Sequence, residues 1–358
     1  MPADILGPDR VEDAARILRE GGLVAFPTDT VYGVAALADS ELHSAKLQAF
    51  KGGRREPFSL HLPDVDSALR FGGPMRELER HAVTQLGPRG VTVIVAHGSS
   101  HAGLGLRIVQ HETGSVFLKL ANAAVVATSA NLHGQPPLCD PDAIAGLPGV
   151  AAVLSTGELP ERPASSVVRM LRCGLEILRE SAVSKSELGG TFTRNVEFVC
   201  LGNLNRSAFA EHLLRAMQQY YVSQLRNFVP AFHLDSSGLI GSPSARVPAG
   251  MHEAAAAYHV EMKAHVPSRF EAAAETPREL IAMGEDVWGE VIAADKTARR
   301  WTVYDPMGGS PMAYRATADQ VRAHMEALLA RTAVVREGDA SMESGFDNLF
   351  SPVSGDDT

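Results

Sequence analysis

The stretch from Val196 to Ser207 reads VEFVCLGNLNRS, and it decides how the second half of the chain folds. A short apolar run ends at Cys200, five residues follow, and Arg206 and Ser207 then lead into an amphipathic segment from Ala208 to about Gln219. This order predicts a strand, a loop of phosphate size and a helix. The backbone N–H groups of such a loop converge on its centre, where the helix dipole adds positive potential.

The residues of this loop point to cysteine-dependent phosphate chemistry. The positive field favours a thiolate at Cys200, and the Arg206 guanidinium can bind two oxygens of a tetrahedral anion. Gly202 permits a tight loop, Asn203 tolerates left-handed backbone geometry, and Ser207 suits a helix N-cap. Cys200 would attack phosphorus and form a thiophosphate ester. A buried structural cysteine is the alternative interpretation of the same residues.

A candidate proton donor lies far downstream, in the segment WTVYDPMGG from Trp301 to Gly309. A thiophosphate route needs an acid to protonate the leaving group. Asp305, which we expect at a strand end before Pro306, is the candidate. An ordinary Asp-Pro turn is the alternative.

Residues 195–333 resemble the low-molecular-weight protein tyrosine phosphatase family, whose pattern is V-C-x-G-N-x-C-R-S, then S-A-G, then D-P. The matching residues here run from Val199 to Ser207, from Ser236 to Gly238, and from Asp305 to Pro306. The resemblance implies a parallel-sheet fold, with Cys200 as nucleophile, Arg206 as phosphate clamp and Asp305 as general acid. It implies that the remaining loop residues form the phosphate-binding loop: Leu201, Gly202, Asn203, Leu204, Asn205 and Ser207.

Three departures from that pattern bear on the substrate. Asn205 stands where the family has a second loop cysteine, so no disulfide partner adjoins the nucleophile. Leu204 stands where the protein arginine phosphatase branch has threonine, which argues against phosphoarginine and leaves open a phosphotyrosine-type phosphomonoester, on a protein or a small molecule. Met307 and Gly308 stand where aromatic residues often follow D-P. An arsenate reductase would pass oxidation to further cysteines, and none follows Cys200.

The first half carries several separated polar motifs between apolar runs. They are PTDTVYGV from Pro27 to Val34, a basic corner at Lys51 and Arg54 before a strand ending near His61, ATSAN from Ala127 to Asn131, SSVV from Ser165 to Val168, and Arg179. A basic, glycine-containing corner can contact phosphate, and a solvated surface loop is the alternative. Small hydroxyl and amide side chains at a strand end can line a ligand site or make a turn.

In this order the motifs resemble the threonylcarbamoyl-AMP synthase family, or YrdC-like domains, over residues 3–184. The resemblance implies a twisted α/β open sheet that uses ATP, threonine and bicarbonate, with Mg²⁺ arriving on ATP, in the pathway to threonylcarbamoyladenosine in tRNA. It implies ATP-binding residues Lys51, Arg54, Ser129, Asn131 and Arg179. It implies threonine-binding residues Thr30, His61, Arg107 and Ser165, and the tRNA threonylcarbamoyl-transfer machinery as a partner.

This half also departs from its family. The family's W-P-G-P-L-T is GPRGVT here from Gly87 to Thr92, R-x-P is Arg107-Ile108-Val109, and R-x-G is Arg179-Glu180-Ser181. Gly53 lengthens the K-x-R spacing by one residue. A degenerate nucleotide-binding module that regulates an active phosphatase is therefore the alternative to a bifunctional enzyme.

We predict an α/β protein with a synthase-like domain at 1–184, a linker at 185–194, a phosphatase-like domain at 195–333 and a disordered acidic tail at 334–358. The 358 residues suit two domains, and the tail contributes −5 of the net charge of −9. Three dispersed cysteines and the lack of a long apolar run predict a soluble cytoplasmic protein. The 13 histidines show no metal-ligand spacing, so no metal site is expected. The segment from Leu280 to Ala294 is expected to be helical, although the family places a strand at its start.

Overall fold

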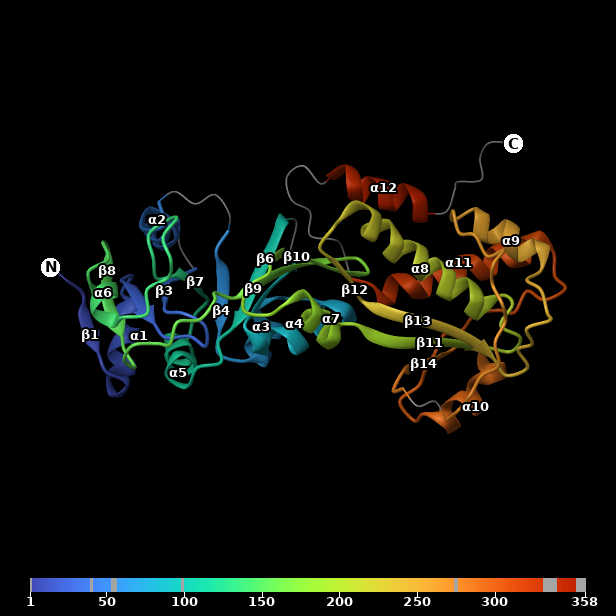
Figure 1. Cartoon of the computed structure of the whole chain (residues 1–358), viewed down its shortest axis with the longest axis horizontal. Coiled ribbons are helices and arrows are strands. Elements are labelled where there is room, and N and C mark those ends of the chain that lie inside the picture. Colours follow the sequence, from blue (N-terminus) through green and yellow to red (C-terminus); the bar gives the residue numbers. More distant parts are fainter. Residues whose placement is uncertain are drawn as a thin grey trace. The chain divides into compact units, whose positions relative to one another are not determined.

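The computed structural model describes residues 2–38, 41–52, 57–97, 100–273, 276–330 and 340–351. The chain forms two compact units. The first comprises Met1–Met75, Glu79–Met170 and Glu176–Phe192, and the second comprises Arg76–Leu78, Leu171–Leu175 and Thr193–Thr358. Both units have α/β architecture, as the sequence predicts (Figure 1).

The first unit is built on a mixed, open sheet. Its strands lie in the order β1 (Asp4–Leu6), β8 (Val150–Leu154), β2 (Leu23–Phe26), β3 (Gly33–Leu37), β7 (Val125–Ser129), β4 (Ser59–Leu62), β6 (Ser100–Ile108), β5 (Val91–His97), β9 (Ser166–Leu171) and β10 (Gly174–Arg179). Strand β3 is antiparallel to β2 and β7, whereas β4 is parallel to β6. Polar motifs far apart in the sequence therefore lie on neighbouring strands β7, β4 and β6.

Helices cover this sheet and close its core. They are α1 (Val11–Arg19), α2 (Glu41–Phe50), α3 (Val65–Phe71), α4 (Glu77–Leu86), α5 (Glu112–Ala121) and α6 (Pro141–Ala145). Helix α1 buries Ala14, Ala15 and Leu18, whose spacing of three to four residues places them on one face. They join Phe26 of β2 and Phe117 of α5 in one apolar cluster.

The second unit contains a parallel sheet in the order β13 (Phe232–Gly238), β11 (Arg194–Cys200), β14 (Glu279–Ala282) and β15 (Arg299–Arg300). Short strand β12 (Phe228–Pro230) precedes β13, and Ala231 separates the two. Helices α8 (Arg206–Gln224) and α11 (Pro311–Leu328) lie on one face of the sheet, and α10 (Glu285–Ala294) lies on the other (Figure 1). Helix α9 (Ala249–Ala256) packs on α11.

The parallel arrangement places the candidate site. All strands of this sheet end at the same edge, where loops of an open α/β sheet bind ligands. Cys200 ends β11, Gly238 ends β13, and Met283 directly follows β14. A Cβ on Gly238 would lie 2.6 Å from the backbone nitrogen of Asn203. Glycine is therefore required where β13 approaches the loop after β11.

The helix expected from Leu280 to Ala294 is wrong in its first part. Residues Glu279–Ala282 form β14 between β11 and β15, and Leu280, Ile281 and Ala282 are buried there. Only Glu285–Ala294 is helical. Apolar residues in a row suit a central strand covered on both faces, and such a run cannot be told from a buried helix by periodicity alone.

The linker expected at 185–194 is also largely helical. Helix α7 (Lys185–Phe192) occupies it and buries Leu188 and Phe192. Its start is capped reciprocally: the Ser184 backbone N–H donates to Glu187 at 2.9 Å, and the Glu187 backbone N–H donates to the Ser184 hydroxyl at 3.3 Å. The Ser-x-x-Glu pattern within a polar stretch thus indicates a helix start.

The acidic tail contains a helix where disorder was expected. Helix α12 (Ala340–Phe350) buries Phe346 and Phe350. Phe346 stacks on Tyr221 with ring centroids 5.2 Å apart, and the Tyr221 hydroxyl donates to Glu343 at 2.8 Å. Two phenylalanines at helical spacing give this polar segment an apolar face. The rest of the predicted tail, at 334–339 and 352–358, lies outside the described residues.

Candidate functional sites

The loop after β11 surrounds the sulfur of Cys200 with hydrogen-bond donors. The backbone N–H of Asn203 donates to Sγ at 3.2 Å, and the Ser207 hydroxyl donates to it at 3.0 Å. The side chain is buried, with 2% of its surface exposed. Two hydrogen-bond donors thus contact the buried sulfur, and such donors stabilise a thiolate nucleophile.

Asn203 fixes the shape of this loop. Its φ of 55° is left-handed, which asparagine tolerates better than most residues. Its Nδ2 donates to the hydroxyls of Ser207 and Ser236, both at 2.9 Å, and its Oδ1 accepts from the backbone N–H of Ser268 at 2.9 Å. These hydrogen bonds fix the conformation of the Asn203 side chain, so the loop is preorganised before a ligand binds.

The guanidinium of Arg206 lies between two carboxylates. Nη1 and Nη2 donate to the two oxygens of Asp286 at 2.8 and 2.7 Å, and Nη2 also donates to Asp305 Oδ2 at 2.7 Å. A further bond joins Nη1 to the Met283 carbonyl at 3.0 Å. Burial lowers the pKa of Arg206, but Asp286, Cys200 and Asp305 together raise it above its ordinary value. The hydrogen bond from Arg206 lowers the pKa of Asp286.

One donor in this arrangement has no acceptor. Arg206 Nε is buried and makes no hydrogen bond to any of the residues that the structure describes. A buried charged donor without a partner is costly, and such groups in proteins are nearly always paired. An oxyanion bound to the loop would supply the acceptor.

Asp305 lies beside the clamp, as the sequence predicts, but in a loop after β15 rather than at a strand end. Its Oδ1 accepts from Asn205 Nδ2 at 3.3 Å and from the Met307 backbone N–H at 3.2 Å. Asn205, which replaces the second loop cysteine of the family pattern, thus contacts the candidate acid. Trp301 to Asp305 run as extended chain, which a run of apolar and β-branched residues cannot distinguish from a strand.

Exposed apolar side chains flank these residues along the chain. Leu201 in the loop is 37% exposed, and Tyr304 and Met307, on either side of Asp305, are 61% and 54% exposed. Exposed apolar side chains that gather in one patch often mark a binding surface, and these three are near Cys200 and Asp305 in the sequence.

In the first unit, Lys51, Ser129 and Asn131 come together as the sequence predicts. Lys51 Nζ donates to Ser129 Oγ at 3.2 Å and to Asn131 Oδ1 at 2.5 Å, and Ser129 Oγ donates to the same amide oxygen at 2.6 Å. The cation is thus fixed at the end of β7, where hydroxyl and amide groups surround it. Arg54, the fourth residue expected here, lies outside the described residues.

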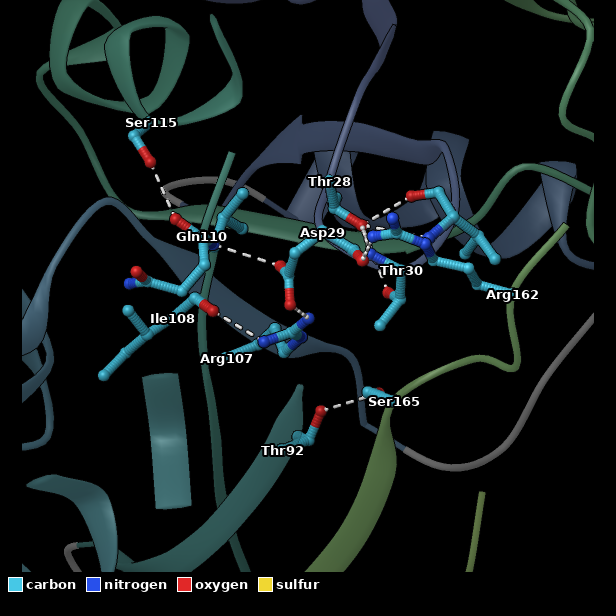
Figure 2. Close-up of polar contacts among 12 residues, drawn as sticks. Thr28, Asp29, Thr30, Thr92, Arg107, Ile108, Gln110, Ser115, Arg162 and Ser165 are labelled. Atoms are coloured by element: carbon cyan, nitrogen blue, oxygen red, sulfur yellow. Dashed lines mark hydrogen bonds and ion pairs between the residues drawn. The ribbon is translucent and has the colours of Figure 1, made fainter. Parts of the chain in front are cut away.

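A second polar cluster surrounds Arg107 on β6 (Figure 2). Arg107 is 2% exposed and donates to Asp29 Oδ2 at 2.7 Å and to the Ile108 carbonyl at 2.6 Å. The other oxygen of Asp29 accepts from the Gln110 backbone N–H at 3.0 Å. Thr30 adjoins Asp29 and lies 3.2 Å from Thr28, hydroxyl to hydroxyl.

His61 and Ser165 extend this cluster. His61 on β4 pairs in register with Arg107, and desolvation of its ring, with the Arg107 charge, lowers the pKa of His61 to about 4. The Ser165 hydroxyl lies 3.1 Å from that of Thr92 (Figure 2), and the Ser165 carbonyl accepts from Arg179 at 2.7 Å. Arg179, a predicted ATP-binding residue, therefore contacts a predicted threonine-binding residue.

Two acidic residues of these sites were missed from the sequence. The apolar periodicity of residues 280–294 presents them as one helix, so Asp286 was not recognised as a site residue. In the structure Asp286 lies in the first turn of α10 and pairs with Arg206. Asp29 stands inside the PTDTVYGV motif, so its position was noted, but its bond to Arg107 joins segments 78 residues apart. No spacing rule connects residues that far apart.

Comparison with known proteins divides the chain in the same way. Residues 16–181 match the family model Sua5/YciO/YrdC, described as telomere recombination, and residues 195–339 match the model of low molecular weight phosphotyrosine protein phosphatase. The threonylcarbamoyl-AMP synthase of Stutzerimonas stutzeri is 29% identical over 187 residues, which are 49% of this chain and 99% of that protein. The enzyme of the same name from Chromohalobacter salexigens is 28% identical over 182 residues, which are 48% of this chain and 97% of that protein.

Two solved structures are similar to parts of the chain. Sua5 of P. abyssi, complexed with L-threonine, is 16% identical, with a TM-score of 0.48, and the match covers 85% of this chain and 100% of that chain. A YwlE mutant from Bacillus subtilis is 23% identical, with a TM-score of 0.32, and the match covers 38% of this chain and 96% of that chain. None of the helices that the structure describes has the length and hydropathy needed to cross a membrane.

Proposed function

This chain joins a segment of the Sua5/YciO/YrdC family to a segment of the low molecular weight phosphotyrosine protein phosphatase family, and from that premise we propose that it is a bifunctional enzyme. Its first unit forms threonylcarbamoyl-AMP and pyrophosphate from threonine, bicarbonate and ATP. Its second unit hydrolyses phosphomonoesters. The observation that carries the second activity is the buried, unpaired Nε of Arg206 at the end of a loop in which the Asn203 N–H and the Ser207 hydroxyl both donate to Cys200 Sγ.

The geometry of the loop supports the following phosphatase reaction. A phosphate oxyanion accepts from Arg206 Nε and the loop N–H groups, and it competes with Asp286 and Asp305 for the rest of the guanidinium. Cys200 Sγ attacks phosphorus, an S–P bond forms, and the P–O bond to the leaving group breaks. Asp305 gives its proton to the departing oxygen. Water, deprotonated by the same carboxylate, then breaks the S–P bond and releases inorganic phosphate.

Exposed apolar groups next to the site favour an aryl substrate. Leu201, Tyr304 and Met307 can contact the ring of a phosphotyrosine. Leu204, partly buried in the loop, adds a hydrocarbon group where a phosphoarginine guanidinium would need a polar partner. We therefore assign phosphotyrosine-type esters, on a protein or on a small molecule, as the substrate class.

The synthase reaction needs positioning and charge neutralisation rather than a nucleophilic side chain. The carbamate oxygen formed from threonine and bicarbonate attacks the α-phosphorus of ATP, and pyrophosphate leaves. Lys51, with Ser129 and Asn131, would bind the phosphates, which bring Mg²⁺ as part of the substrate, and Arg54 would join them. Thr30, His61, Arg107 and Ser165 would bind threonine, and Arg179 acts through Ser165. The product would pass to the enzymes that modify tRNA.

A regulatory role for the first unit is the second candidate, and one observation favours it. The Arg107 guanidinium is already engaged by Asp29 and by the Ile108 carbonyl, so less of its charge is available to a substrate. In that case the unit would bind a nucleotide without turnover, and only the phosphatase would be active.

Two assays test the pair of activities. Hydrolysis of p-nitrophenyl phosphate should be lost in Cys200→Ser and retained in Cys139→Ser, a matched change in the first unit. Equal rates in Cys200→Ser and the unaltered chain would refute the phosphatase. Pyrophosphate release that requires both threonine and bicarbonate supports the synthase, whereas nucleotide binding without such release would favour the regulatory role.

A further inference from the structure

Three potential metal ligands meet behind the loop, although they are far apart in the sequence. Glu211 and His212 lie on α8, and His265 lies in the irregular segment after α9. One ligand atom from each lies within 4.8 Å of the others. Glu211 is buried and both histidines are partly exposed, so an ion could enter from solvent. Linear spacing does not predict this cluster, because 53 positions separate the histidines.

The hydrogen bonds of His265 determine which of its nitrogens can bind a metal. Its Nε2 lies 2.9 Å from the carbonyl oxygen of Asn203, which can only accept a hydrogen bond. Nε2 therefore carries the proton, and in the neutral ring Nδ1 presents a lone pair. That lone pair faces His212 Nε2 at 3.2 Å.

His212 presents a lone pair to the same point. Its Nε2 lies 3.2 Å from Nδ1 of His265, and the tautomer with the proton on Nδ1 carries a lone pair on Nε2. A cation bound by both nitrogens would replace the hydrogen bond that the two rings otherwise make to each other.

The distances suit a tetrahedral transition-metal ion. Metal–nitrogen bonds of about 2.0–2.1 Å at tetrahedral angles place two ligand nitrogens about 3.3 Å apart. A metal-bound histidine commonly donates its other ring N–H to a backbone carbonyl, as His265 does to Asn203. The Glu211 carboxylate now accepts from Arg215 and from the Ser236 hydroxyl, and it has lone pairs left for a metal.

We propose that Glu211, His212 and His265 bind a divalent transition-metal ion of the Zn²⁺ class, with water as a fourth ligand. Imidazole and carboxylate ligands suit Zn²⁺ and Co²⁺ better than Mg²⁺ or Ca²⁺. The site contacts the anion loop at two points: His265 bonds the Asn203 carbonyl, and Glu211 bonds Ser236, which accepts from Asn203 Nδ2. The ion would therefore stabilise the backbone of Asn203.

The test uses the full chain with the change Cys200→Ser, which removes the thiol as a competing ligand. Co²⁺ is added alone, and its visible d–d bands report both stoichiometry and coordination geometry. We expect one ion per chain with the intense bands of a four-coordinate site, and Zn²⁺ should displace it. No uptake, or only the weak bands of six-coordinate Co²⁺, would refute the proposal.

Variants assign the uptake to this cluster. His212→Gln should weaken Co²⁺ binding by about 100-fold, and Glu211→Gln, which keeps the shape of the side chain, by about 10-fold. His252→Gln, on α9 outside the cluster, is the matched control and should bind as the parent does. Unchanged binding in both cluster variants would refute the proposal. Zn²⁺ should also raise the melting temperature of the parent but not of His212→Gln, a readout that does not depend on phosphatase activity.

Discussion

The two sites of this chain are built in opposite ways. In the second unit, seven consecutive residues from Cys200 to Arg206 supply the nucleophile, the loop and the clamp, and a single distant segment adds Asp305. In the first unit, the polar residues come from six or more segments between Thr28 and Arg179, which meet on neighbouring strands. The second site depends on the conformation of one loop, whereas the first depends on the register in which the strands of the whole sheet pair.

This difference explains why departures from the family pattern have different consequences in the two units. The short loop can change at Leu204 and Asn205 without losing its contacts to the sulfur, because the Asn203 backbone N–H and the Ser207 hydroxyl make them. A site assembled from many strands has more positions at which a substitution alters the residues that line it. The comparison predicts that single changes in the second unit have larger effects than single changes in the first.

The largest effect should come from Arg206→Lys. Lysine keeps the charge but lacks the planar fork and Nε, so it cannot bind two phosphate oxygens at once. We expect kcat/KM for p-nitrophenyl phosphate to fall by about 1,000-fold or more. Arg315→Lys, a change on α11 away from the loop, is the control. A loss below about 10-fold would mean that charge alone is enough.

Asp305→Asn should cost somewhat less, by about 100- to 1,000-fold in kcat. The loss should depend on the leaving group, because a poor leaving group needs protonation more than a good one does. Rates should therefore be compared for phenyl phosphate and for p-nitrophenyl phosphate. If the two substrates lose rate equally, Asp305 positions Arg206 rather than donating a proton.

Lys51→Ala should lower threonine-dependent pyrophosphate release by about 100-fold, through the loss of one positive charge at the phosphates. Phosphatase activity should be unchanged in the same sample, which serves as an internal control for folding. A concurrent loss of both activities would contradict the separation of the two sites. Retained pyrophosphate release would mean that Lys51 holds only Ser129 and Asn131 in place.

Sequence reasoning recovered the local features of this chain better than the distant ones. The loop from Cys200 to Ser207 was predictable because strand, turn and helix signals follow one another within a dozen residues. Asp305 was placed with Arg206 on the need for a proton donor and on the family pattern, and Asp286 was missed because β14 and α10 present one continuous apolar pattern. The contacts that matter most beyond the loop join positions tens of residues apart, which composition and periodicity do not encode.

The same limit applies to the tail and to the histidine cluster. Helix α12 was taken for disorder because acidic and small residues dominate it, yet Phe346 and Phe350 suffice to bind it to Tyr220 and Tyr221. His212 and His265 were judged by their spacing alone. In both cases the deciding partner lies on α8 or in the loop that follows α9, and only the folded chain places it there.

The smallest effect concerns pH, because the titration of the partly buried His61 ring reports on the folding of the first unit. The pKa of His61 is about 4 in the folded chain, below its ordinary value of 6.5, because its ring is desolvated and lies near Arg107. The unfolded chain therefore binds more protons between these two pH values. The contribution of His61 to the free energy of unfolding is therefore fully present above about pH 6.5, and it is lost as the pH falls toward 4.

We expect the unfolding midpoint of the first unit to fall by a few degrees between pH 7 and pH 5, and the fall to be smaller in His61→Gln, which cannot titrate. Thermal unfolding followed by circular dichroism at both pH values measures the difference. His133→Gln, in an exposed turn after β7, is the matched control and should keep the slope of the parent. An equal slope in His61→Gln would show that the ring is not desolvated, and the polar cluster around Arg107 would then be open to water.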